Sequence, residues 1–294
     1  MSFIKNKYFQ GLIGLLSLGY LIYVLDRKST ELTWPKLSFI QNLNLIIPIV
    51  FLAISNWTLE ILRWKIINSP KAHISFKQSF IQNLKGHSAG IISPMKLGEY
   101  PIKLSFFPKE KHKYIAYNIF SLNLTQLLAT LIFGTIGLFY ISEKELEFLY
   151  EELPFMKSIL ITGGVCLVIF YLAVNRNVLI QNRQLWKVIL LAMTRYLCFS
   201  SAYVWGLYYI GSPLSIAELY AFTSVSYLLL TLVPLMSIFD LVIKTTVFVA
   251  VFSLTGTSSI SVIFISFLMW FFNWGVPAIL GSSLMFKKAK LNLR

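Results

Sequence analysis

Two short polar motifs interrupt an otherwise apolar sequence, and they share the same order of residue types. Each has a proline, a carboxylate five or six residues later and a lysine four residues after the carboxylate: Pro94, Glu99 and Lys103 in the first, and Pro234, Asp240 and Lys244 in the second. A charge at the centre of a bilayer costs about 2.5–3.5 kcal/mol on insertion scales, so charges kept there usually serve a function. Their repetition favours a shared role.

Residues four apart lie on the same face of a helix, which allows two interpretations of each carboxylate–lysine pair. The pair can neutralise itself, so that the helix tolerates the membrane. Alternatively, Glu99 or Asp240 organises a turn while Lys103 or Lys244 binds an anionic head group. Pro101 lies between Glu99 and Lys103, and a helix containing that pair must begin close to it.

The first polar region is rich in cations. Residues 75–107 contain Lys77, Lys85 and Lys96, and only Glu99 is available locally to balance them. We expect Lys77 to extend to the inner membrane surface. Lys85 and Lys96 either do the same or face a hydrated cavity, and a net positive cavity suits an anionic ligand such as a phosphate.

Arg195 lies about seven residues into an apolar segment, and we expect it to face the bundle interior, toward Asp240 or Glu218. It serves there as a structural counter-ion or as a further contact to the head group. A stripe of Asn118, Asn123 and Gln126 is explained equally well by interhelical hydrogen bonds and by substrate contacts.

Signals of catalysis are weak. Residues 86–90 read Gly-His-Ser-Ala-Gly, which matches a nucleophile elbow in letters, but no strand pattern precedes them and we expect close helix packing instead. The three histidines and two cysteines are scattered, so we expect no metal and no cofactor. Cys166 and Cys198 lie in apolar segments and should be free thiols.

Composition indicates an all-α, polytopic integral membrane protein. Of 294 residues, 56% are hydrophobic and only 13% are charged, about half the usual share of a soluble domain. At about 20 residues per span, the length allows about eight spans in a single transmembrane domain, 1–294. The net charge of +14 comes from basic residues beside apolar runs, which is typical of positive-inside topology and not of a nucleic-acid-binding protein.

The apolar segments give the topology. Clear spans are predicted at about 8–25, 43–62, 114–140, 155–174, 188–210 and 260–285. Lysine-rich loops at 63–77 and 103–113 and the basic C-terminus should be cytoplasmic, whereas the acidic loop 142–154 and the uncharged loops 211–215 and 256–259 should be outside. The prediction is a multi-pass protein of the cell (inner) membrane with cytoplasmic N- and C-termini.

Two polar regions, about 75–107 and 216–256, are too long for one span each. The first begins and ends inside, which predicts a re-entrant hairpin broken at Pro94, Gly98 and Pro101. The second begins and ends outside and is broken at Pro234, so it is either a hairpin or two short spans. If both are hairpins, the fold is an inverted repeat with a site near the midplane.

The stretch from Asn83 to Lys103, with its Pro94-x-x-x-Gly98-Glu99 core, resembles the signature of the lysylphosphatidylglycerol synthase transmembrane-domain family, whose members are flippase-like. Lys96 stands where that family usually has a basic residue and Lys103 where an arginine is common. The second motif, from Pro234 to Asp240, is also similar, although the family's Gly-rich turn is replaced here. Asn123 and Gln126 stand where many members carry charges.

Together these features predict a flippase-like protein, not an enzyme, that moves or helps to move an anionic phospholipid or polyprenyl-phosphate lipid between leaflets. Its partners would be the lipid head group and membrane lipids, with no nucleic acid. The binding residues would be Lys85, Lys96, Glu99, Lys103, Arg195, Asp240 and Lys244. The alternatives are a membrane-embedded lipid-modifying enzyme and a non-transporting scaffold for a partner enzyme; a homo-oligomer is compatible with any of these.

Overall fold

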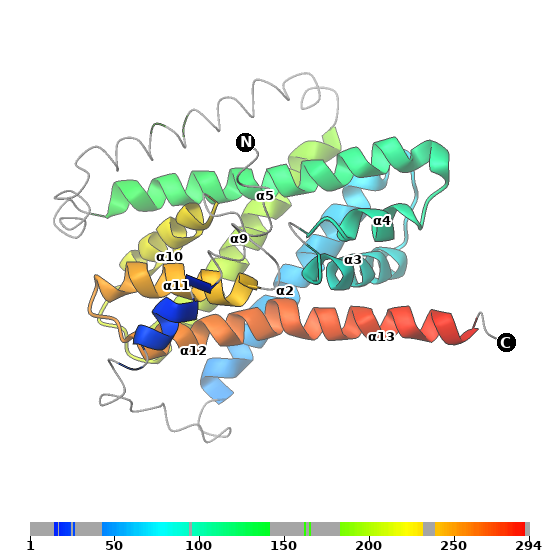
Figure 1. Ribbon diagram of the computed structural model, residues 1–294. Coiled ribbons are helices and arrows are strands. Elements are labelled where there is room, and N and C mark those ends of the chain that lie inside the picture. The colour runs from blue at the N-terminus through cyan, green and yellow to red at the C-terminus, as the bar shows by residue number, and fades with distance from the viewer. Residues whose placement is uncertain are drawn as a thin grey trace.

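The computed structural model describes residues 43–93, 96–141, 183–231 and 239–291, together with parts of 15–26 and positions 162 and 165. Every secondary-structure element in this described part is helical (Figure 1). Four helices are long and apolar enough to cross a membrane: Leu43–Asn68, Lys109–Tyr140, Gln184–Tyr209 and Ser259–Met285. The described part of the chain is therefore all-helical with four candidate membrane spans, as expected of an all-α membrane protein, and the number of about eight spans stays a prediction. Half of the predicted span 8–25, and nearly all of 155–174, lies outside the described residues.

The helices fall into two units of similar order. In the first, α2 (Leu43–Asn68) precedes α3 (Phe76–Ile91), α4 (Glu99–Leu104), a 3-10 turn at Lys109–Lys111 and α5 (His112–Tyr140). In the second, α9 (Arg183–Tyr209) precedes α10 (Ile216–Leu230), α11 (Asp240–Ser253) and α12 (Ser259–Trp270). A π-helix, η7 (Phe271–Gly275), then joins α12 to α13 (Val276–Leu291). Each unit is thus a long helix, a hairpin and a second long helical segment.

Both hairpins begin with the same capping device. The Ser75 hydroxyl accepts from the Gln78 N–H while the Gln78 side chain accepts from the Ser75 N–H, and Ser215 and Glu218 do the same for α10. This capping box fixes the start of α3 and of α10. Their 16 and 15 residues reach only about 24 and 22 Å, less than the ~30 Å hydrocarbon core. Region 216–256 is therefore a pair of short helices, α10 and α11.

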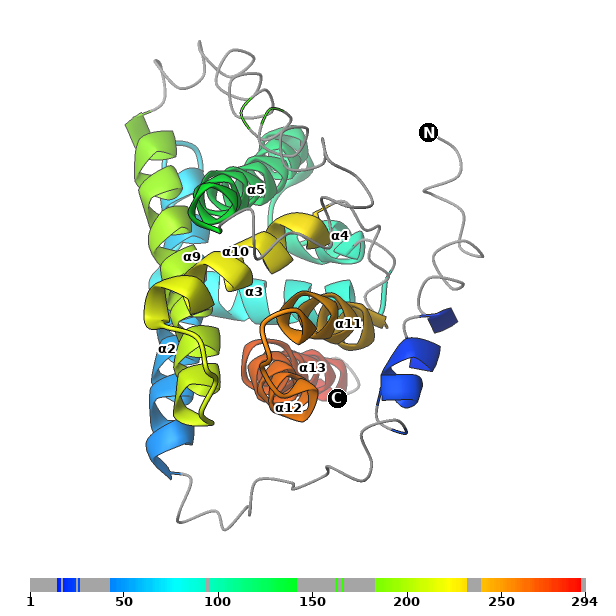
Figure 2. The same cartoon turned by 90° about the vertical axis from the view of Figure 1, so that its left-hand side faces the viewer.

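The packing of the two units is reciprocal. Helix α2 packs along α9, while α3 of the first unit packs on α13 of the second and α10 of the second packs on α5 of the first (Figure 2). Exchanging the units leaves this set of contacts unchanged. The first helices of the two hairpins, α3 and α10, start from opposite ends of the molecule (Figure 1).

The two ends of the bundle differ in charge. One end holds the loops 69–75 and 105–111, with Lys71, Lys109 and Lys111, and here the Lys111 Nζ donates to the Lys71 carbonyl at 2.8 Å (Figure 1). The opposite end holds the loops 211–215 and 254–258, neither of which carries a charged residue. This is the distribution that a positive-inside membrane protein requires.

Two prolines inside the long helices are each matched by a tryptophan from another helix. Pro48 cannot donate to the Asn44 carbonyl, and the Trp205 indole of α9 donates to that oxygen at 3.2 Å. Pro277 cannot donate to the Asn273 carbonyl, and the Trp57 indole of α2 donates there at 3.0 Å. A carbonyl that loses its N–H donor to a proline needs another donor inside a membrane, and each indole supplies one. The same two bonds link α2 to α9 and to η7.

Replacing Trp205 by phenylalanine should therefore lower the free energy of unfolding by about 1 kcal/mol, because the Asn44 carbonyl loses its donor. Unfolding in mixed detergent micelles, followed by circular dichroism, measures this. In a Pro48→Ala background the restored N–H should remove most of the cost. Trp186→Phe on the exposed side of the same helix is the matched control. An equal cost of Trp205→Phe in both backgrounds would contradict the assignment.

Candidate functional site

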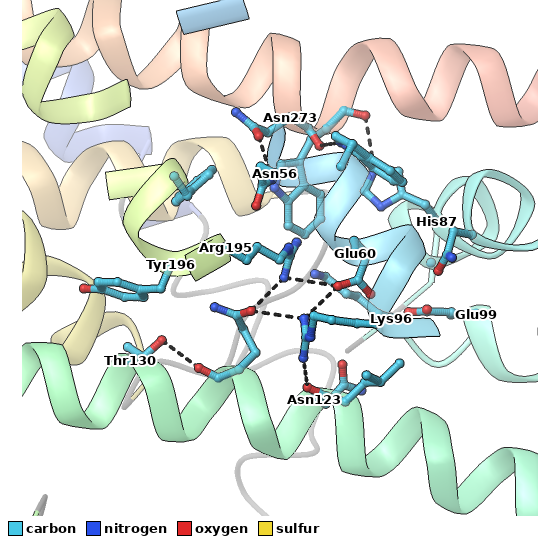
Figure 3. Close-up of a pocket in the computed structure, with 18 of the residues that line it drawn as sticks. Asn56, Glu60, His87, Lys96, Glu99, Asn123, Thr130, Arg195, Tyr196 and Asn273 are labelled. Carbon is cyan, nitrogen blue, oxygen red and sulfur yellow. Dashed lines mark hydrogen bonds and ion pairs between the residues drawn. The ribbon is translucent and has the colours of Figure 1, made fainter. Parts of the chain in front are cut away.

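A cavity of about 370 Å³ is lined by residues of both hairpins (Figure 3). The first hairpin lines it with Ile91, Lys96 and Glu99, and the second with Leu230, Thr231 and Lys244. The long helices α2, α5 and α9 and the π-helix supply the remaining walls. Both polar motifs of the sequence therefore reach the same cavity.

Glu60 holds one wall of the cavity together. Its Oε2 atom lies 2.7 Å from Arg63 Nη1 on the same helix and 3.5 Å from Arg195 Nη1 on α9. The Gln126 Oε1 atom of α5 accepts from both arginines, at 3.2 and 2.8 Å. Arg63, only 1% exposed, also donates to the Leu122 carbonyl and the Thr125 hydroxyl. Glu60 thus links α2 to α9, and the two arginines that it pairs with link both helices to α5.

The predicted direction of Arg195, toward Asp240 or Glu218, was wrong. Arg195 faces Glu60 and Gln126 instead (Figure 3). The two expected partners are already occupied, because Glu218 completes the capping box of α10 and Asp240 pairs with Lys244.

The two motif pairs are self-neutralising, and they are oriented oppositely. Glu99 pairs with Lys103, and Asp240 pairs with Lys244 at 2.8 Å. In the first hairpin the acid lines the cavity while Lys103 is 1% exposed and lies over the Trp64 ring. In the second hairpin Lys244 lines the cavity while the Asp240 side chain is 3% exposed. Each pair is thus both an internal ion pair and a source of one cavity charge.

Lys96, in the first hairpin, has an unusual backbone conformation. Lys96 has a φ of +58°, in the left-handed region that residues other than glycine usually avoid. Its N–H donates to the Ser93 carbonyl at 3.3 Å. The Ser93 hydroxyl accepts from the Gly98 N–H at 2.7 Å. A strained lysine at a turn is typical of a functional position. Here the turn aims the Lys96 ammonium at the face of Trp274, 3.8 Å from the ring centroid.

Trp274 belongs to the π-helix and collects contacts from three elements. Lys244 lies over the same ring at 4.2 Å, and His87 of α3 contacts it at a centroid distance of 5.2 Å. The His87 Nε2 atom lies 3.2 Å from the Trp274 carbonyl, so this nitrogen carries the proton. Next to it, Asn273 accepts from the Asn56 amide at 2.8 Å. The widened backbone at η7 is what presents Asn273 and Trp274 to the cavity.

Four of the seven predicted binding residues line the cavity: Lys96, Glu99, Arg195 and Lys244. Lys85, Lys103 and Asp240 do not. Lys85 lies over the Phe106 ring at 5.9 Å, and the other two are the buried partners of cavity residues. Gly98 and Pro101 lie at the start of α4, as expected of a helix that must begin near Pro101. Pro94 and Pro234 lie outside the described residues.

The other polar signals divide between packing and the cavity. Asn118 donates to the Asn68 side chain, whereas Asn123 and Gln126 line the cavity, so the stripe serves both purposes. The predicted helix packing at residues 86–90 is confirmed, because Ser88 donates to the Ala278 carbonyl at a close crossing of α3 and α13. Cys198 is a free thiol, and Cys166 lies outside the described residues.

Sequence reasoning missed Glu60, His87, Asn273 and Trp274 as cavity residues. Their signal was weak but present. Glu60 and Asn273 are polar residues within long apolar segments, and Pro277, four residues after Asn273, marks a break in the helix ladder.

Among the described residues, no three His, Cys, Asp or Glu side chains gather as a metal site would require. The absence of a cofactor stays a prediction. No family model, curated protein or solved structure matches the chain. The resemblance to the lysylphosphatidylglycerol synthase transmembrane-domain family therefore stays a prediction too.

The turn geometry gives a test of the first hairpin. A Cβ on Gly98 would collide with the Ala89 carbonyl and approach the Ser93 hydroxyl to 2.9 Å, whereas a Cβ on Gly90 would make ordinary contacts at 3.6 Å or more. Gly98→Ala should destabilise the protein by about 1–3 kcal/mol through overpacking, and Gly90→Ala should be neutral or stabilising. Thermal unfolding of both variants in detergent measures the difference, and equal melting temperatures would count against this turn.

Proposed function

We propose that this chain is a flippase-like protein that moves an anionic lipid head group between membrane leaflets. The single observation that carries the proposal is the cavity between two opposed hairpins, lined by Lys96, Arg195 and Lys244. A head group needs a polar route through the hydrocarbon layer, and such a route is stable only where protein or water satisfies its polar atoms.

The arrangement of the hairpins supports this role. Their first helices are too short to cross the hydrocarbon core, they start from opposite ends of the bundle, and they belong to units with reciprocal packing. We infer an inverted repeat, in which a central site is reached alternately from either side. The resemblance of the first motif to a flippase-like family points the same way.

The charge distribution suggests an orientation. We assign the end with Lys71, Lys109 and Lys111 to the cytoplasm of a cell-membrane protein, together with the C-terminus. The first hairpin then enters from the cytoplasmic side and the second from the opposite side.

Lys96→Ala should reduce leaflet exchange at least about tenfold, because the head group loses a cavity charge worth about 1.4 kcal/mol or more to the barrier. Liposomes containing purified protein and a fluorescent phosphatidate, with the outer leaflet reduced chemically, give the exchange rate. Lys85→Ala removes a lysine from the same hairpin but outside the cavity and should leave exchange unchanged. Lys96→Arg should retain part of the rate.

Folding is not expected to limit this test, because Lys96 has no carboxylate within 4 Å among the described residues. Exchange by wild-type protein no faster than in protein-free liposomes would overturn the proposal. So would a Lys96→Ala rate equal to that of the wild type.

A further inference from the structure

We propose that the cavity selects a doubly charged phosphate monoester head group over a singly charged phosphodiester. This inference rests on the proposed function and names the substrate class of the same site. Three independent features support it: the charge balance of the site, the spacing of its cations and the direction of its hydrogen-bond donors.

The charge balance comes first. Among the described residues, five cationic side chains meet three carboxylates at the site: Arg63, Lys96, Lys103, Arg195 and Lys244, against Glu60, Glu99 and Asp240. Each carboxylate is closely paired with one lysine or arginine of its own helix. Two positive charges are therefore in excess, and burying them is costly unless an anion of matching charge is bound. A phosphate monoester carries close to two negative charges at neutral pH, and a diester carries one.

Two cations of the cavity, Lys96 without a carboxylate partner among the described residues and the paired Lys244, lie over one ring, that of Trp274. Lys96 Nζ and Lys244 Nζ lie 3.8 and 4.2 Å from the centroid of this one ring, and since these distances add to 8.0 Å the two nitrogens are no farther apart than that. The indole stabilises both ammonium groups without neutralising them. Separate oxygens of one phosphate, each accepting at about 2.8 Å, can therefore bridge them.

The Gln126 amide supplies a further donor, because its contacts with Arg63 and Arg195 fix its orientation. Arginine only donates, so the Gln126 amide must turn its oxygen toward Arg63 and Arg195. Its Nε2 group then points away from the arginines, on a side chain that lines the cavity, and can act as a donor there. Lys96, Lys244 and Gln126 thus offer donors from three of the elements around the cavity. A monoester has three terminal oxygens to receive them, whereas a diester has two.

A second, small and largely apolar pocket adjoins the cavity, which favours a lipid over free phosphate. This pocket of about 20 Å³ shares Phe199, Tyr227, Lys244 and Trp274 with the main cavity. Its other walls are mostly apolar or aromatic, including Phe248 and Met269 between α11 and α12. The first apolar atoms of a lipid would lie here while its phosphate lies between the lysines.

Native mass spectrometry of the purified full chain in detergent tests the inference without measuring transport. The probes are dioleoyl phosphatidate, a monoester, and dioleoyl phosphatidylmethanol, a diester with identical acyl chains. We expect phosphatidate to bind at least about tenfold more tightly, the effect of one additional charge-assisted hydrogen bond. Inorganic phosphate, added at the same concentration, should neither bind comparably nor displace phosphatidate.

Variants link the preference to the residues. Lys96→Gln should weaken phosphatidate binding at least about tenfold and abolish the preference over phosphatidylmethanol, while Lys85→Gln should change neither. Equal affinity of the wild type for both lipids would overturn the inference yet leave flipping of anionic lipids intact. Phosphatidate selectivity without leaflet exchange would instead support the site and contradict transport. Comparable binding of inorganic phosphate would assign the site to a soluble ligand.

Discussion

The pairing of Glu60 with two arginines is the interaction on which the rest of the site depends. Arg63 is almost completely buried and Arg195 partly so, and neither position is tolerable in a low-dielectric interior without a counter-charge. By bridging them, Glu60 allows α2, α5 and α9 to line one cavity without leaving the two arginines uncompensated. The hairpins then need only supply the ends of the cavity, which explains how such short helices can contribute to a site deep in the bundle.

The two hairpins share the same arrangement of residues but expose charges of opposite sign to the cavity. Each begins with a capping box and carries an acid followed by a lysine one turn later, but the buried partner is the lysine in one and the acid in the other. Corresponding positions of the two hairpins thus give the cavity one carboxylate and one ammonium. The left-handed lysine at position 96 adds the charge that breaks this balance, and its strained backbone indicates that the position matters more than the local stability it costs.

Much of the fold could be predicted from sequence, because a helix that crosses the membrane needs an apolar segment whose length matches the thickness of the hydrocarbon core. The spans within the described residues, the break near Gly98 and Pro101 and the pairing of the motif charges follow from local rules. The cavity walls do not. Glu60, Asn273 and Trp274 are recognisable only when helices far apart in sequence are brought together, and the direction of Arg195 depends on which carboxylates are already paired. Local pattern identifies the charges; tertiary packing decides which of them meet.

The two tryptophan–proline contacts have a mechanical consequence. Helix α2 receives an indole from α9 near its beginning and donates one to η7 from its middle, so it is fastened to its neighbours at two levels. Neither fastening involves a hairpin helix. If the hairpins of the proposed flippase rock to expose the cavity to one side and then the other, α2 and α9 would form the stationary frame about which they pivot. The hydrogen bond from the Trp57 indole to the Asn273 carbonyl would then keep the neighbouring Trp274 ring at a constant depth in the membrane.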